Sequence, residues 1–183
     1  MRILLLRHAK SSWDHRGLID HDRPLAPRGE RAATAMGAHA AAGSLRVDRV
    51  VSSTALRAQS TARRFLSAFN STIPMTTRHD LYHAGAMVLL AIAIHEAGGD
   101  DDARIMLVGH NPGMHELACG LATAGEPIEL ARLQTKFPTG ALAEFDLPDS
   151  PGLSGSQGSR LPFGQLKRLV RPKDLPVAQE FRF

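Results

Sequence analysis

Arginine and histidine side chains occur at three points of the 183-residue chain where they could act together on a phosphoryl group. Arg7 and His8 are adjacent, Arg57 comes later, and His110 stands before Asn111. An arginine guanidinium can bind two phosphoryl oxygens through parallel hydrogen bonds. A neutral imidazole is a competent nucleophile near pH 7. These residue types therefore indicate phosphoryl transfer, provided that the fold brings them to one place.

Each of these points follows an apolar run that predicts a buried strand. The predicted strands cover residues 2–6, 47–51 and 104–109. Ligands bind outside the carboxyl ends of the strands in an open parallel sheet, so we expect the three ends to form one pocket. Ser53 and Asn111 lie just beyond two of these strands and are further candidates for binding the phosphate. Two predicted helix N-termini at the same edge would also favour a dianion.

Helical patterns alternate with these strands along the chain. This alternation predicts an α/β fold, a three-layer α/β/α sandwich with a mostly parallel central sheet. Two later strands, over 141–147 and 166–170, predict an antiparallel, hairpin-like edge. The Pro-, Gly- and Ser-rich segment 148–165 predicts a flexible loop within a single domain of residues 1–183. The predicted helices cover residues 27–43, 55–69 and 87–97, with a fourth that begins at Pro112 and an extended segment near 74–77 before the third.

The two histidines can have different roles in such a pocket. One would attack phosphorus, and the neighbouring arginines would keep its imidazole neutral. The other, if protonated, would stabilise the charge that grows on the equatorial oxygens. Phosphoryl transfer depends mainly on positioning and charge stabilisation, so we expect neither a metal ion nor another cofactor.

Several sequence motifs of the chain resemble those of a known family. "LLLRHAKSSW" is similar to the first arginine–histidine motif of the histidine phosphatase superfamily, the phosphoglycerate-mutase-like enzymes. "VVSSTALRAQSTA" resembles its second-arginine motif and "IMLVGHNPGM" its second-histidine motif. With "DRPLAPRGERAA", "LYHA" and "FPTGALAEF", the chain is similar to the SixA-like phosphohistidine phosphatase branch. The resemblance implies that His8 is the nucleophile and becomes phosphohistidine, and that Arg7, Arg57 and His110 form the rest of the phosphate pocket.

The chain departs from the family pattern at two positions. Ala9 replaces the usual glycine after the first histidine. His83 stands where many relatives carry a glutamate that protonates the leaving group, so that carboxylic acid is predicted to be absent. His83 is itself a candidate proton donor, and Asp20 and Asp22 in the loop 9–26 are others.

The missing acid favours one kind of substrate. An alkoxide leaving group needs a proton, whereas an imidazole, whose conjugate acid has a pKa of about 6.5, needs it less. We therefore expect a phosphorylated substrate whose phosphate is carried by a histidine of a protein. Mutase activity is disfavoured for the same reason.

Several alternatives stay open. The first is a small-molecule phosphomonoesterase of the same superfamily. A metallohydrolase would use the nine histidines, for example His79 with His83, or His110 with His115 and Glu116, but no HExxH pattern occurs and arginines would repel a cation. A non-catalytic phosphate-binding module is the third alternative.

Composition narrows the possible partners further. A net charge of +4 without a basic run, together with one Trp and one Tyr, disfavours nucleic-acid binding. No signal peptide or membrane span is predicted, and the single cysteine, Cys119, suits a reducing compartment, so the expected location is the cytoplasm. The sequence does not predict an oligomeric state.

Overall fold

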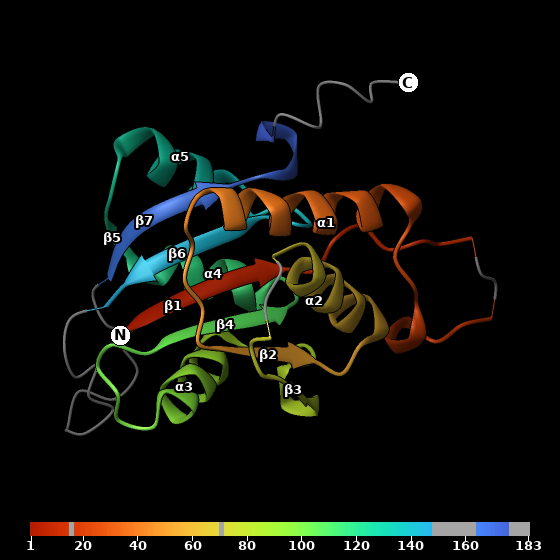
Figure 1. Cartoon of the computed structure of the whole chain (residues 1–183), viewed down its shortest axis with the longest axis horizontal. Coiled ribbons are helices and arrows are strands. Elements are labelled where there is room, and N and C mark those ends of the chain that lie inside the picture. The colour runs from red at the N-terminus through yellow and green to blue at the C-terminus, as the bar shows by residue number, and fades with distance from the viewer. Residues whose placement is uncertain (15–16, 70–71, 148–163, 176–183) are drawn as a thin grey trace.

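Seven strands form one sheet in the order β3-β2-β4-β1-β6-β7-β5 in the computed structural model, which describes residues 1–14, 17–69, 72–147 and 164–175 (Figure 1). Strand β6 runs antiparallel to its neighbours β1 and β7, and the other neighbouring strands pair in parallel. The strands are β1 (Arg2–Arg7), β2 (Arg49–Ser53), β3 (Met75–Arg78), β4 (Arg104–Gly109), β5 (Ala122–Ala124), β6 (Leu142–Asp146) and β7 (Gly164–Val170).

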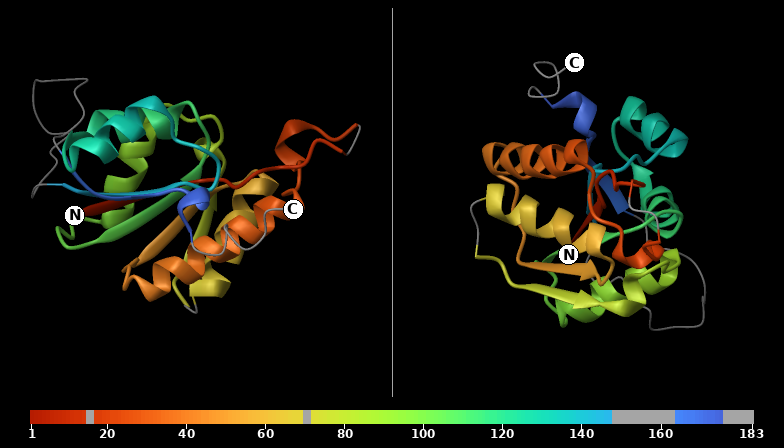
Figure 2. Two further views of the ribbon diagram at one scale, coloured as in Figure 1. Left: turned by 90° about the horizontal axis from the view of Figure 1, so that it is seen from above. Right: turned by 90° about the vertical axis from the view of Figure 1, so that its right-hand side faces the viewer.

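Helices cover both faces of the sheet, which gives the three layers that the sequence predicts (Figure 2). Helices α1 and α2 pack on one face, and α3, α4 and α5 on the other. Three short 3₁₀ helices complete the described structure. The α-helices are α1 (Pro27–Ala42), α2 (Leu56–Phe69), α3 (Ala86–Ala97), α4 (Gly113–Leu121) and α5 (Pro127–Thr135), and the 3₁₀ helices are η1 (Asp20–Asp22), η2 (His79–Leu81) and η3 (Pro172–Asp174).

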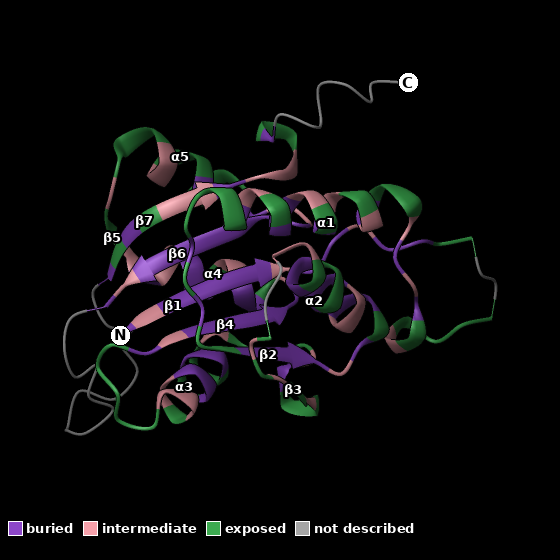
Figure 3. Ribbon diagram, in the orientation of Figure 1, coloured by how far each residue is buried: buried purple, intermediate pink, exposed green. Residues whose placement is uncertain are grey.

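The central strand β1 shows why the sheet is buried on both sides. Leu4 and Leu6 pack toward α1 and α2, whereas Ile3 and Leu5 pack toward α3 and α4. Successive side chains of a strand point to opposite faces, so a run of aliphatic residues fits a strand that is covered twice. Figure 3 shows the middle of the sheet as continuously buried. Its apolar packing holds the polar strand ends in fixed positions.

Most predicted elements lie close to their expected positions, with three differences. Strand β2 begins at Arg49 and extends through Ser53, two residues beyond the predicted end at residue 51, so Ser53 belongs to the strand. The sequence does not predict β5 or α5. Strand β5 is short and partly exposed, and Leu133 is the one residue that α5 buries fully, so neither element has a clear apolar pattern. Gly164 and Gln165 of the predicted flexible loop begin β7, and residues 148–163 lie outside the described residues.

No helix within the described ranges combines the length and apolar character needed to cross a membrane.

Candidate active site

Strands β2, β4 and β1 are adjacent and parallel, so their carboxyl ends meet at one edge of the sheet. The backbone N–H of His8 donates to the carbonyl of Gly109 at 3.0 Å, which aligns the ends of β1 and β4. The imidazole rings of His8 and His110 lie 4.9 Å apart between centroids. Ser53 at the end of β2 bonds to His110. The structure thus brings together the residues that the sequence places after three separate strands.

His8 is held in a single orientation and a single tautomer. Its Nδ1 lies 2.8 Å from the carbonyl oxygen of Ala9, which can only accept a hydrogen bond, so Nδ1 carries the ring proton. Burial lowers the pKa of His8 to about 4; the Ala9 carbonyl opposes this, and the positive charges of Arg57 and Arg7 add to it. His8 is therefore neutral near pH 7, and its Nε2 presents a lone pair.

His110 is the second histidine of the pocket. Its Nε2 lies 2.9 Å from the hydroxyl of Ser53, whereas its buried Nδ1 has no hydrogen-bond partner among the described residues. Burial lowers the pKa of His110 to about 3, and the positive charge of Arg57 adds to this effect. His110 is thus neutral in the free pocket, and a bound dianion would raise its pKa.

Arg7 and Asn111 are fixed through one shared carbonyl. Arg7 Nη1 donates to the carbonyl of Phe137 at 2.8 Å, and Asn111 Nδ2 donates to the same oxygen at 3.1 Å. The buried Nε of Arg7 and Oδ1 of Asn111 have no partner in the part of the chain that the structure describes. An unpaired buried donor is costly, so the Arg7 Nε–H is available to an anion.

Arg57 already contacts a carboxylate. Its Nη2 donates to Asp20 Oδ2 at 2.8 Å, and its Nη1 donates to the backbone carbonyl of the same residue. The hydroxyl of Tyr82 donates to Asp20 Oδ2 at 2.8 Å, and Arg23 Nη1 donates to Oδ1 at 2.9 Å. Partial burial raises the pKa of Asp20, but the hydrogen bonds from Tyr82, Arg23 and Arg57 outweigh it and hold the pKa well below its usual range. Asp20 is consequently ionised at neutral pH.

Asp20, Arg23 and Tyr82 are the pocket residues whose roles sequence reasoning missed. The sequence indicates Asp20 as a candidate proton donor, but an ionised carboxylate has no proton to give near pH 7. Arg23 is buried and fixes the loop 9–26 through the Ser12 carbonyl and the Ser11 hydroxyl. Asp20 and Arg23 are visible in the stretch "DHDRP", but the sequence does not show that Asp20 contacts both Arg23 and Arg57.

His83 lies at the rim of the same pocket. Its ring is 4.2 Å from that of Tyr82 and stacks on His110 at 5.8 Å between centroids. Its backbone has a φ of 55°, a conformation that is rare for a non-glycine residue and that often occurs at functional sites. A Cβ on Gly113 would lie 1.9 Å from the carbonyl oxygen of Ala84, so this glycine allows α4 to approach the segment that carries His83.

The candidate metal ligands do not form a cluster among the described residues. No group of three or more His, Cys, Asp or Glu side chains lies within reach of one metal ion among those residues. His115, one residue of the metallohydrolase alternative, bonds to the carbonyl of Leu133 at 2.7 Å instead.

The α/β sandwich, with arginines and histidines at the carboxyl edge of its sheet, is typical of enzymes that transfer phosphoryl groups. Residues 3–87 match the model of the histidine phosphatase superfamily (branch 1). The chain belongs to this superfamily and, within it, to the SixA-like branch. Membership of this superfamily supports phosphatase activity for the chain.

Three similar proteins illustrate this placement. A solved structure of the "putative phosphohistidine phosphatase SixA" of Agrobacterium tumefaciens is 30% identical, with a TM-score of 0.75, and the match covers 93% of this chain and 97% of that one. An uncharacterized protein of Mycobacterium tuberculosis is 39% identical over 75% of this chain and 84% of its own length. A mycobacterial glucosyl-3-phosphoglycerate phosphatase, 16% identical with a TM-score of 0.56 over 91% of this chain and 96% of that one, shares the fold.

Proposed function

We propose that this chain hydrolyses phosphohistidine in a protein through a covalent phosphohistidine intermediate on His8. The observation that carries the proposal is the state of the carboxyl group in the pocket. Asp20 is held ionised by Tyr82, Arg23 and Arg57. A pocket whose carboxyl group has no proton at neutral pH favours a leaving group that hardly needs one.

The reaction has two phosphoryl transfers. In the first, the Nε2 lone pair of His8 forms a bond to phosphorus while the P–N bond of the substrate breaks. The other ring nitrogen of the substrate takes a proton from solvent, so that the leaving imidazole departs neutral. In the second, the oxygen of a water molecule forms a bond to the phosphorus on His8 while the P–Nε2 bond breaks. The water gives up a proton to solvent, inorganic phosphate leaves, and Nε2 regains its lone pair.

The other predicted site residues bind the transferred group or hold in place the residues that bind it. Arg7 offers its unpaired Nε–H, and Arg57 offers its guanidinium once Asp20 shares or releases it. His110 donates from its ring, with Ser53 fixing the orientation of that ring. Asn111 keeps the Phe137 carbonyl, and so Arg7, in place. These groups supply positioning and charge stabilisation without a metal ion.

The loop beside Asp20 supports a protein as the substrate. Trp13, Leu18 and Ile19 in this loop are 73%, 45% and 66% exposed. Large apolar side chains gathered on one exposed loop are typical of protein contact sites. Ile19 directly precedes the carboxylate that contacts Arg57, so a protein bound to the loop would lie over the pocket.

The second candidate function is that of a small-molecule phosphomonoesterase. The position of His83 favours it, because this exposed ring lies 4.2 Å from Tyr82 at the pocket rim and could protonate an alkoxide. The fold is shared with a phosphatase of a phosphorylated sugar derivative. The two candidates differ in how strongly turnover depends on the leaving group.

The test is a comparison of substrates with one enzyme preparation. We expect kcat/KM on a histidine-phosphorylated test protein to exceed that on 3-phosphoglycerate by at least about 100-fold, since loss of general acid catalysis costs about 10²–10⁴-fold. His8→Ala is the control and should abolish both activities. Comparable turnover of the two substrates would overturn the proposed substrate class, and activity in His8→Ala would overturn the mechanism.

A further inference from the structure

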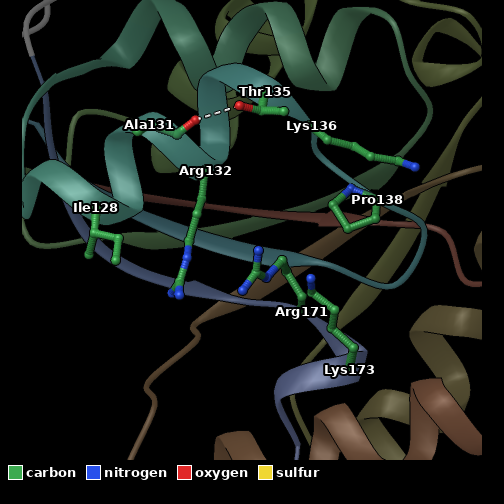
Figure 4. Close-up of a pocket in the computed structure, with 8 residues that line it drawn as sticks. All are labelled: Ile128, Ala131, Arg132, Thr135, Lys136, Pro138, Arg171 and Lys173. Atoms are coloured by element: carbon green, nitrogen blue, oxygen red, sulfur yellow. Dashed lines mark hydrogen bonds between the residues drawn. The ribbon is translucent and has the colours of Figure 1, made fainter.

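A basic groove lies between α5 and the end of β7, outside the catalytic pocket. Its volume is about 480 Å³, and the residues used below that line it are Ile128, Arg132, Lys136, Pro138, Arg171 and Lys173. Figure 4 shows Arg132 reaching from α5 and Arg171 reaching from the end of β7 into the same space. None of these side chains has a part in the phosphoryl transfer derived above.

Ion pairs within the described residues involve two of the four positive side chains in the groove. Arg132 pairs with Glu129, and Arg171 forms two hydrogen bonds to Asp174 at 2.6 and 2.9 Å. Lys136 and Lys173 are exposed and form no ion pair within the described residues. The groove therefore carries an excess of positive charge and favours an acidic ligand.

The sheet register places the groove at the same edge as the catalytic histidine. Leu6 of β1 pairs with Leu142 of β6, and Leu142 pairs with Val170 of β7. Arg171, which follows Val170, thus lies level with the end of β1. Neighbouring strands are about 4.8 Å apart, so the two strand ends are separated by roughly 10 Å.

One segment forms a wall of both sites. The carbonyl of Phe137 accepts from Arg7 in the catalytic pocket, whereas Lys136 and Pro138 on either side of it line the groove. Gly140 donates to the carbonyls of Arg7 and His8. A Cβ on Gly140 would lie 2.8 Å from the ring of Pro172, so the same segment also packs against the residue between Arg171 and Lys173.

We propose that this groove is a docking site for an acidic segment of the phosphorylated protein substrate, an inference that rests on the proposed function. A protein surface easily spans the roughly 10 Å between the two strand ends, whereas a small phosphate ester bound at His8 would have to cross the segment 136–140 to reach the groove. The side chain of Ile128, 60% exposed, adds an apolar contact beside the charges. Carboxylates near the phosphohistidine of the substrate would pair with Lys136 and Lys173.

The test reverses the two unpaired charges. For the variant Lys136→Glu/Lys173→Glu we expect kcat/KM on an acidic histidine-phosphorylated test protein to fall at least about tenfold, with most of the change in KM, because like charges at an interface suppress association. Turnover of p-nitrophenyl phosphate should stay within about twofold of the wild-type value, since the catalytic pocket is unchanged. The matched control is Arg46→Glu/Lys167→Glu, which makes the same change in net charge with exposed residues that line a different pocket, together with Arg2 and Arg104.

Changes to the test protein and to the enzyme separate docking from catalysis. A test protein whose carboxylates near the phosphohistidine are changed to amides should be processed equally by the wild type and the groove variant. Docking in the groove is wrong if the variant keeps full activity on the acidic protein, or if the control variant loses as much activity. If the wild type hydrolyses p-nitrophenyl phosphate through His8 but not the phosphoprotein, the proposed substrate class fails, and the docking proposal fails with it.

Discussion

The carboxylate of Asp20 lies 2.8 Å from Nη2 of Arg57, so the arginine predicted to bind phosphate is engaged by an internal anion in the free protein. A phosphoryl group that enters the pocket must share Arg57 with this carboxylate. Asp20 also accepts from the Tyr82 hydroxyl, and this contact ties the loop 9–26 to the segment that carries His83. One side chain thereby couples two segments that border the pocket.

Removal of this charge should strengthen the binding of an oxyanion. For Asp20→Asn we expect the inhibition constants of inorganic phosphate and vanadate to fall about 3- to 10-fold, because the partly exposed carboxylate no longer competes for Arg57 or repels the dianion. The measurement is competitive inhibition of p-nitrophenyl phosphate hydrolysis. Asp22→Asn is the matched control, since exposed Asp22 contacts His21 and should leave both constants unchanged. Weaker oxyanion binding in Asp20→Asn would show instead that Asp20 serves mainly to position Arg57.

The lowered pKa of His8 should appear as a loss of stability in acid. In the folded protein the pKa of His8 is about 4, against about 6.5 in an unfolded chain. Between these two values the unfolded chain binds more protons, so the free energy of unfolding should decrease as the pH falls from about 6.5 to about 4. Urea unfolding of the wild type and His8→Gln over this range checks the effect. The variant should lose less stability on acidification, and an equal loss in both proteins would contradict a neutral, buried His8.

His83 should matter only where the leaving group needs a proton. For His83→Gln we expect kcat on an alkyl phosphate to fall about 10- to 100-fold, toward the lower range of general acid catalysis. Turnover of a phosphohistidine protein should stay within about twofold, because the imidazole leaves without the help of this residue. Steady-state kinetics on the two substrates separates these effects. An equal fall on both would assign His83 to binding rather than to proton transfer.

Gly113 should be intolerant of even one added methyl group. In Gly113→Ala the new Cβ would meet the carbonyl oxygen of Ala84 at 1.9 Å, so α4 or the segment with His83 must move. We expect a loss of about 1–3 kcal/mol in the free energy of unfolding, the usual cost of overpacking. Gly85→Ala is the control, because its Cβ would have nothing within 4 Å. Equal stability of the two variants in urea unfolding would contradict this close approach.

The catalytic edge of the sheet can be predicted from the sequence because an aliphatic run marks each strand and polar residues mark its end. The aliphatic runs before Arg7 and His110 indicate buried strands, and parallel strands bring their carboxyl ends to one edge. Asp20 could not be placed in this way. It lies in a loop without a periodic pattern, and its position depends on hydrogen bonds from Arg57 and Tyr82, far along the chain.

Strand β5 and helix α5 are less predictable from the sequence, for a different reason. Strand β5 has three residues and is specified mainly by pairing with β7. Helix α5 is largely exposed, so its pattern of apolar residues is weak. The basic groove is built from this helix and the end of β7, and no local motif marks it.

The most direct test of the mechanism is to identify the phosphorylated residue during turnover. A test protein carrying ³²P-labelled phosphohistidine is mixed with the enzyme and quenched in alkali, where phosphohistidine survives, and the enzyme is mapped by mass spectrometry. The account predicts transient label on Nε2 of His8 before phosphate is released, and neither label nor turnover in His8→Ala. Label on another residue, or phosphate release by His8→Ala, would contradict it.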